Sequence, residues 1–83
     1  MANEDVKKKL IALGAKVQGR QLNREEEVRI EQTLAKAPPK SRTQVRQVLA
    51  ESLNKTETDV LVKLLSHDDS DRLIDEIVNV LGK

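Results

Sequence analysis

The sequence predicts an all-α fold, a compact bundle of four or five short helices with a central buried fourth helix. Three observations support this prediction. Apolar residues recur at steps of three and four along most of the chain, which is the spacing of one face of an α-helix. Residues that cap helices, together with Pro38-Pro39, divide the chain into short segments. Residues 60–65 are apolar except at Lys63, and such a helix needs covering on all sides.

The first helix is expected to start at Asn3, a favourable N-cap residue, and to end at Gly19. Gly14 lies within it and either permits close packing or marks a break. The helix is expected to bury one continuous apolar stripe. The stripe consists of Val6, Leu10, Leu13 and Val17.

The second helix is expected to follow Asn23, where Glu26 completes a capping-box pattern, and to end at Pro38-Pro39. It is rich in Glu and Arg, so we expect it on the outside of the core. The third helix is expected to start at Ser41, with Gln44 in the reciprocal capping position. Its inward face is predicted to contain Val45, Val48, Leu49 and Leu53.

Thr56 is expected to cap the fourth helix, which contains the apolar segment 60–65. Acidic residues open the last helix at 68–71, and Gly82 lies where a C-terminal cap is expected. The last helix carries a broad apolar stripe. This stripe consists of Leu73, Ile74, Ile77, Val78 and Leu81, and Val80 lies beside it.

The composition limits the possible functions. A chain of 83 residues is expected to form one helical domain, residues 1–83. It contains no Phe, Tyr or Trp, so it has no stacking platform for single-stranded nucleic acid. No apolar run approaches the roughly 20 residues that span a bilayer, and the start does not resemble a signal peptide. Because cysteine is also absent, a cytoplasmic location is expected.

The sequence offers little for catalysis. It has one His, no Cys and no glycine-rich phosphate loop, so we expect no enzyme, no catalytic residue and no cofactor. The cluster His67-Asp68-Asp69-Ser70-Asp71 lacks the glycine and the ligand spacing of a calcium loop. We expect these carboxylates to stabilise the start of the last helix, and we predict no metal site.

Charge is unevenly distributed along the chain. Ten Lys and Arg and six acids occur up to Arg42, against five and eight in the remainder, or about +4 and −3. This split can reflect helix-end preferences, or it can mark a basic face and an acidic face. A basic patch is predicted at Lys7, Lys8, Lys9, Lys16 and Arg20. These residues are either solvated or meet nucleic acid, anionic lipid or an acidic protein.

The segment Ser41-Arg42-Thr43-Gln44-Val45-Arg46 resembles the recognition helix of winged-helix bacterial repressors of the GntR kind. The resemblance implies that polar side chains at its start enter the major groove of double-stranded DNA. The candidate DNA-binding residues are Lys40, Ser41, Arg42, Thr43, Gln44 and Arg46. The likeness is confined to about a dozen residues. The preceding turn contains Pro38-Pro39, and no strands follow to form a wing, so no family is assigned.

The last helix has more apolar residues than one buried face requires, which is typical either of an interface or of a helix buried on two sides. The candidate partner-binding residues are Leu73, Ile77, Val80 and Leu81. We therefore expect a small non-enzymatic regulatory or adaptor module that binds a protein partner, or itself as a homodimer, through helical surfaces. The alternative is a helix-turn-helix-like DNA-binding regulator that uses the helix starting at Ser41.

Overall fold

The computed structural model describes residues 2–81, with side chains from residue 4 onward. In this part of the chain five helices follow one another and no strand occurs, which confirms the all-α prediction. The helices are α1 (Ala2–Gln18), α2 (Arg24–Lys36), α3 (Arg42–Leu53), α4 (Glu57–Leu65) and α5 (Ser70–Leu81). None of these described helices is both long enough and apolar enough to cross a membrane.

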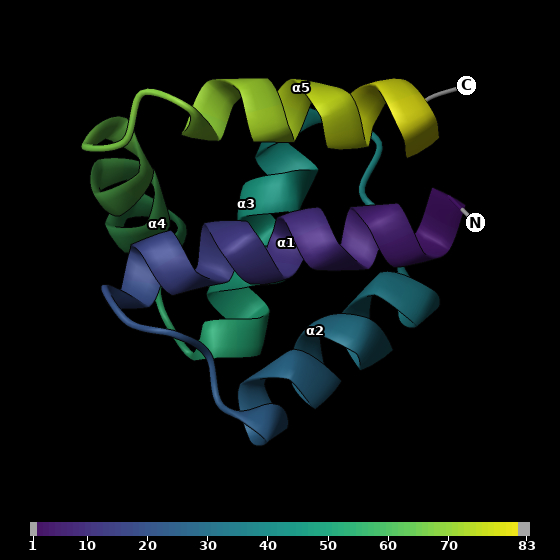
Figure 1. Ribbon diagram of the computed structural model, residues 1–83, viewed down its shortest axis with the longest axis horizontal. Helices are drawn as coiled ribbons and strands as arrows, with labels where there is room; N and C mark the ends of the chain where they lie inside the picture. Colours follow the sequence, from purple (N-terminus) through teal and green to yellow (C-terminus); the bar gives the residue numbers. More distant parts are fainter. Residues whose placement is uncertain (1, 82–83) are drawn as a thin grey trace.

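The two central helices are α1 and α3, which cross each other in the middle of the molecule (Figure 1). Helix α5 runs along one side of α1 in the opposite direction, and α2 lies on its other side. Helix α4 lies at the end of the molecule, next to the C-terminal end of α1. All five helices contribute to one apolar core. Its buried members are Val6, Leu10, Leu13, Val17, Leu22, Ile30, Leu34, Val45, Val48, Leu49, Ala50, Leu53, Val60, Leu64, Ile74 and Ile77.

Three predicted N-caps are confirmed. The Asn23 side chain accepts a hydrogen bond from the Glu26 amide at 2.9 Å, and the Glu26 carboxylate accepts one from the Asn23 amide at 3.0 Å. Ser41 Oγ accepts from the Gln44 amide at 3.2 Å, and Thr56 caps α4 in the same way. These side chains satisfy amide groups that have no partner inside the helix.

The ends of the chain differ from the prediction. Helix α1 already includes Ala2, so Asn3 lies inside the helix and is not its N-cap. The Asn3 side chain, and the expected C-terminal cap at Gly82, lie outside the described residues. At the other end of α1, Gly19 has a φ of +70°, the left-handed conformation expected where a helix ends.

Helix α1 continues through Gly14 without a break, and the glycine is there for close packing. A Cβ atom at this position would lie 2.8 Å from Cδ1 of Leu22 and 3.4 Å from Cδ1 of Ile30. The missing side chain therefore lets the loop before α2, and α2 itself, approach the backbone of α1.

The prediction that the fourth helix is central and buried is wrong. Val60 and Leu64 are buried, but Leu61, Val62 and Leu65 are 40%, 56% and 70% exposed. The reason is that α4 packs only one face against the rest of the bundle. The central position belongs to α3, whose inward side includes the small residues Ala50 and Ser52.

Candidate interaction surface

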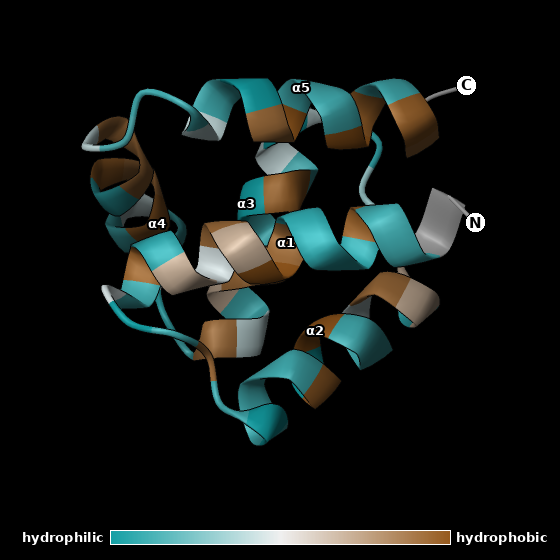
Figure 2. Cartoon of the chain, in the orientation of Figure 1, coloured by the Kyte–Doolittle hydropathy of each residue, from teal (hydrophilic) through white to brown (hydrophobic). Residues whose placement is uncertain are grey.

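An exposed apolar stripe runs along α4 on the side away from the core. It consists of Thr58, Leu61, Val62 and Leu65, which we call the α4 stripe. These positions are three, four and seven residues apart, so they form one face of the helix. Hydrophobic segments of α4 accordingly lie at the edge of the molecule (Figure 2).

The local sequence fixes the direction in which this stripe points. Val60 and Leu64 are one turn apart, and both are buried in the core. Thr56 Oγ1 accepts from the Asp59 amide at 3.1 Å and fixes the start of the helix. The preceding turn depends on Asn54, whose φ of 56° is left-handed. The buried pair and the cap together orient the apolar stripe toward solvent.

Two surface hollows flank α4. One has a volume of about 280 Å³ and is lined by Val17, Lys55, Asp59, Val62 and Lys63. The other has a volume of about 140 Å³ and is lined by Arg46, Leu61, Leu64, Leu65, His67, Asp68, Asp71 and Ile74. Their walls combine aliphatic carbon with charges of both signs. Among the described residues, no group of three or more His, Asp or Glu side chains is arranged to hold a metal ion.

The charged groups on and next to α4 make no ion pair with other residues in the described structure. This holds for Lys55, Glu57, Asp59 and Lys63, all of which are exposed. The ion pairs of the described chain instead involve α1, the loop after it, α2, the start of α3, the loop before α5 and α5 itself. The surface around α4 is therefore both apolar and rich in unpaired charge.

This surface was not predicted from the sequence, because all of residues 60–65 were expected in the core. The short length of the helix, together with its many apolar residues, was the feature that could have predicted an exposed stripe. A helix of nine residues that packs against a bundle on one side needs only one apolar stripe, and this one has two.

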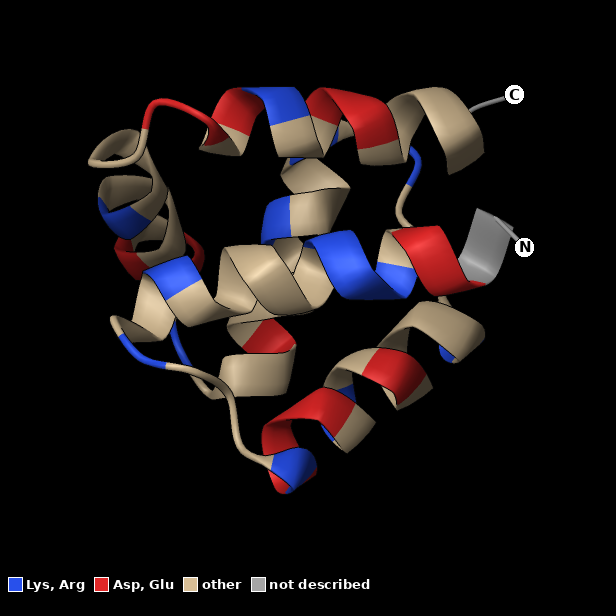
Figure 3. Ribbon diagram, in the orientation of Figure 1, with Lys and Arg blue, Asp and Glu red and all other residues tan. Residues whose placement is uncertain are grey.

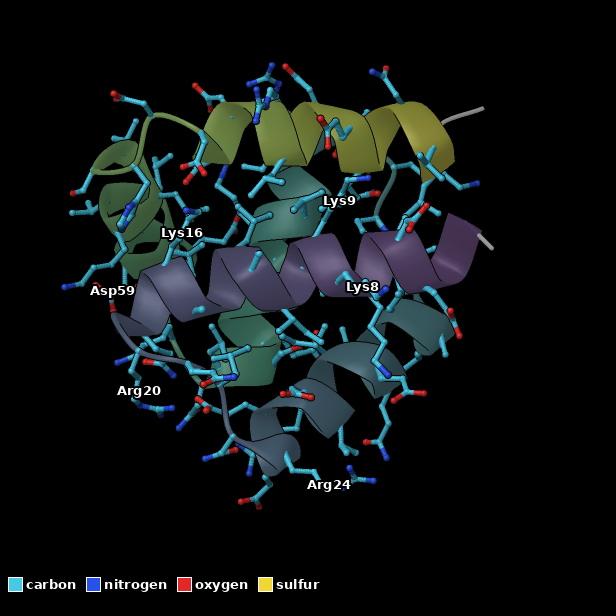
Figure 4. All side chains as sticks on the ribbon, in the orientation of Figure 1. Lys8, Lys9, Lys16, Arg20, Arg24 and Asp59 are labelled. Atoms are coloured by element: carbon cyan, nitrogen blue, oxygen red, sulfur yellow. The ribbon has the colours of Figure 1, made fainter. Side chains whose placement is uncertain are left out.

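The predicted basic patch is largely neutralised by neighbouring acids. Four of its five members form ion pairs, which are Lys7 with Glu31 at 3.1 Å, Lys9 with Glu76 at 3.6 Å, Lys16 with Asp69 at 3.1 Å and Arg20 with Glu26 at 2.9 Å. Figure 3 shows the basic segments of α1 between acidic segments of α2 and α5. In Figure 4, Lys9 and Lys16 lie on the α5 side of α1. Lys8 has no ion pair within the described structure.

Ion pairs within the molecule join the basic first half of the chain to the acidic second half. Cations of the first half pair with acids of the second half at Lys9, Lys16 and Arg42. The hydrogen bond and charge of Lys16 lower the pKa of the Asp69 carboxyl. The fold therefore places complementary charges beside each other and does not collect them on one basic and one acidic face.

The residues predicted to read DNA lie together at the start of α3, but several are already engaged. Ser41 caps the helix, and the Gln44 side chain accepts from the Lys40 amide at 2.7 Å. Arg42 pairs with Asp71 at 3.6 Å and also with Asp75 of α5. The remaining candidates are Lys40 and Thr43, which are exposed, and Arg46, which is half-buried and donates to Thr43 Oγ1 at 3.4 Å. The carboxylates of α5 beside Arg42 would repel phosphates.

The residues predicted to bind a partner from the last helix belong mainly to the core. Ile77 is fully buried, so it cannot contact a partner in this conformation. Leu73 and Leu81 are half-buried and pack against the core, and Val80 is 39% exposed. The surplus of apolar residues on α5 is used in packing against α1 and α3.

A buried carboxylate joins the end of α1 to the start of α2. Glu26 is 6% exposed and accepts from Arg20 at 2.9 and 3.1 Å, from the Gln18 side chain at 2.9 Å and from the Asn23 amide at 3.0 Å. These hydrogen bonds lower the pKa of Glu26 to about 2, and the bond from Arg20 has the largest effect. Every donor to this carboxylate comes from the same corner of the fold, so the arrangement is a structural connection between two helices.

Comparison with known proteins adds no functional information. No protein-family model, no curated protein and no solved structure matches this chain.

Proposed function

We propose that this chain is a small non-enzymatic regulatory or adaptor module that binds a protein partner through the α4 stripe. The observation that carries the proposal is the exposure of Leu61, Val62 and Leu65 on one helical face. Single exposed apolar residues are common on protein surfaces. A contiguous group bordered by charged residues is typical of an interaction site. We also propose a cytoplasmic location, because the chain contains no cysteine.

The composition of the stripe suggests a weak and reversible contact. The exposed fractions of Leu61, Val62 and Leu65 together amount to about 1.7 whole side chains. At about 2 kcal/mol for each buried aliphatic side chain, this chain would contribute about 3 kcal/mol, and an aliphatic partner a similar amount. Lost translational and rotational freedom costs about 4 kcal/mol or more and offsets most of this gain, which leaves a dissociation constant on the order of 1 mM or weaker. Affinity of that size suits a transient regulatory contact.

The proposal can be tested with a photoactivated cross-linking residue introduced at position 62 or 65 of the full chain in its native cells. The matched control carries the same residue at Val80, an exposed aliphatic position on α5. We expect defined protein adducts from positions 62 and 65 and none of the same adducts from position 80. Absence of adducts at both α4 positions, or identical adducts at all three, would refute the proposal.

The DNA-binding alternative has weaker support. Lys40 and Thr43 are exposed at the start of α3, but Ser41 and Gln44 are used in local hydrogen bonds and Arg42 faces acids. Titration of mixed duplex DNA at low salt, followed by backbone amide shifts, tests this alternative. Salt-dependent shifts confined to residues 40–50 would support it, and unchanged shifts there would exclude it.

A further inference from the structure

We propose that the α4 stripe binds the α4 stripe of a second copy of this chain, with the two helices antiparallel. This inference rests on the proposed function and names its partner. It is carried by the charges beside the stripe, which complement themselves only when the two helices run in opposite directions.

The stripe defines the register of such a pair. Its midpoint falls between Leu61 and Val62, because its first and last members are Thr58 and Leu65. In an antiparallel pair centred on that midpoint, Leu61 lies opposite the partner's Val62. Thr58 lies opposite the partner's Leu65, and its methyl group provides apolar contact. Each exposed aliphatic side chain of one copy thus meets an apolar group of the other.

The charges on one flank of the stripe then match. Asp59 and Lys63 are one turn apart on the same flank of α4, and neither forms an ion pair within the described structure. In the antiparallel pair, Asp59 lies next to the partner's Lys63 and Lys63 lies next to the partner's Asp59. In a two-fold parallel pair, this flank would face the opposite flank of the partner, so Asp59 and Lys63 would not meet each other. Antiparallel helix dipoles add a further favourable contribution.

A surface hollow on the same flank of α4 can accept side chains of a second copy. The hollow of about 280 Å³ is bordered by Val62 as well as by Asp59 and Lys63, and Val17 of α1 forms part of its wall. Side chains from the α4 of a second copy can enter it from the solvent side. The contact is nevertheless small compared with the standard size of about 800 Å² per partner. We therefore expect a dimer that forms only at high concentration.

The orientation of the helices can be tested with single cysteines, because the natural chain has none. The variants are Thr58→Cys, Val62→Cys and Leu65→Cys, all at exposed positions of the stripe. A disulfide requires Cα atoms roughly 4.4–6.8 Å apart. Position 62 lies close to the two-fold axis of an antiparallel pair, whereas two copies of position 58 are about 10 Å apart along the helix axis.

Under mild oxidation on the order of 1 mM protein, we expect Val62→Cys to form disulfide-linked dimers. We expect Thr58→Cys and Leu65→Cys to form few dimers when oxidised alone and abundant mixed dimers when oxidised together. Efficient dimers of Thr58→Cys alone would indicate parallel helices and would overturn the inference.

The second measurement is the oligomeric state of the unmodified chain and of Leu65→Glu. Sedimentation equilibrium with interference optics is suitable, because the chain has no Trp or Tyr for absorbance. We expect Leu65→Glu to weaken self-association at least about 10-fold, because each dimer would bury two carboxylates against aliphatic groups. The control Val80→Glu adds the same charge on α5 and is expected to leave self-association unchanged.

The outcomes separate this inference from the proposed function. A chain that stays monomeric at about 1 mM, combined with cross-linked adducts of another protein at positions 62 and 65, would overturn the inference and support the proposed function. Cross-linked adducts with the chain itself at those positions would support both. Monomeric behaviour without any adduct would overturn both.

Discussion

Replacement of Glu26 by Gln tests whether the carboxylate between α1 and α2 stabilises the fold through its charge. The carboxylate accepts four hydrogen bonds, from the side chains of Gln18 and Arg20 and from the Asn23 amide. A glutamine amide has a single acceptor oxygen, and its NH2 group would face donors. The substitution therefore removes the charge and leaves donors in a buried site unsatisfied.

The magnitude follows from the pKa. Folding lowers the pKa of Glu26 from 4.5 to about 2, which corresponds to about 3 kcal/mol at 1.36 kcal/mol per unit. Arg20 is half-exposed, so water screens part of its interaction, and we expect Glu26→Gln to cost about 2 kcal/mol at pH 7. A carboxyl with a lowered pKa stabilises the fold above its unfolded pKa and loses this effect as the pH falls toward its folded pKa. The cost of the substitution should therefore fall to less than half by about pH 3.

The assay is urea unfolding at pH 7 and pH 3, followed by far-ultraviolet circular dichroism, since the chain has no Trp or Tyr. The matched control is Glu25→Gln, which removes the same charge from the same turn of α2. Glu25 is exposed and contacts Arg29 at 3.2 Å, so this change should cost less than about 0.5 kcal/mol. Equal costs for the two variants at pH 7, or a cost of Glu26→Gln that does not depend on pH, would refute the reasoning.

Three further substitutions test the packing by the same urea unfolding assay. Gly14→Ala should destabilise the fold by about 1 kcal/mol although alanine favours helix, because the new methyl group meets Leu22; unchanged stability would contradict the close packing. Ile77→Ala should cost about 3 kcal/mol, and Val80→Ala less than about 0.5 kcal/mol, because Ile77 alone of the two is fully buried; equal costs would contradict this difference. Ser70→Ala should be neutral or stabilising by up to about 1 kcal/mol, because the buried Ser70 hydroxyl has no hydrogen-bond partner among the described residues; a loss above 1 kcal/mol would be evidence for one.

The helices and most of their starting points could be predicted from the sequence because they depend on neighbouring residues. The caps at Asn23, Ser41 and Thr56 each act on an amide three residues later. The apolar stripes of α1 and α3 repeat at the helical period, and their members are buried. Local signals of this kind require no knowledge of what packs against the helix.

The position of α4 could not be predicted because it depends on contacts between distant segments. A short helix with apolar residues on two faces is compatible both with a buried core element and with a surface element that has an exposed stripe. The choice depends on which other helices occupy the centre, and here α1 and α3 do. The same limit applies to the basic patch, whose neutralising partners Glu76 and Asp69 are more than 50 residues away from Lys9 and Lys16.

The structure separates residues that maintain the fold from residues available for binding, even within one short helix. Val60 and Leu64 are buried, so changes there should reduce stability and affect binding only through unfolding. Leu61, Val62 and Leu65 border the solvent, so polar replacements there should leave stability within about 0.5 kcal/mol and still reduce any contact made by the stripe. A helix needed only for packing would have no reason to keep both sets apolar. The coexistence of the two sets on nine residues is therefore the physical basis for proposing an interaction role for α4.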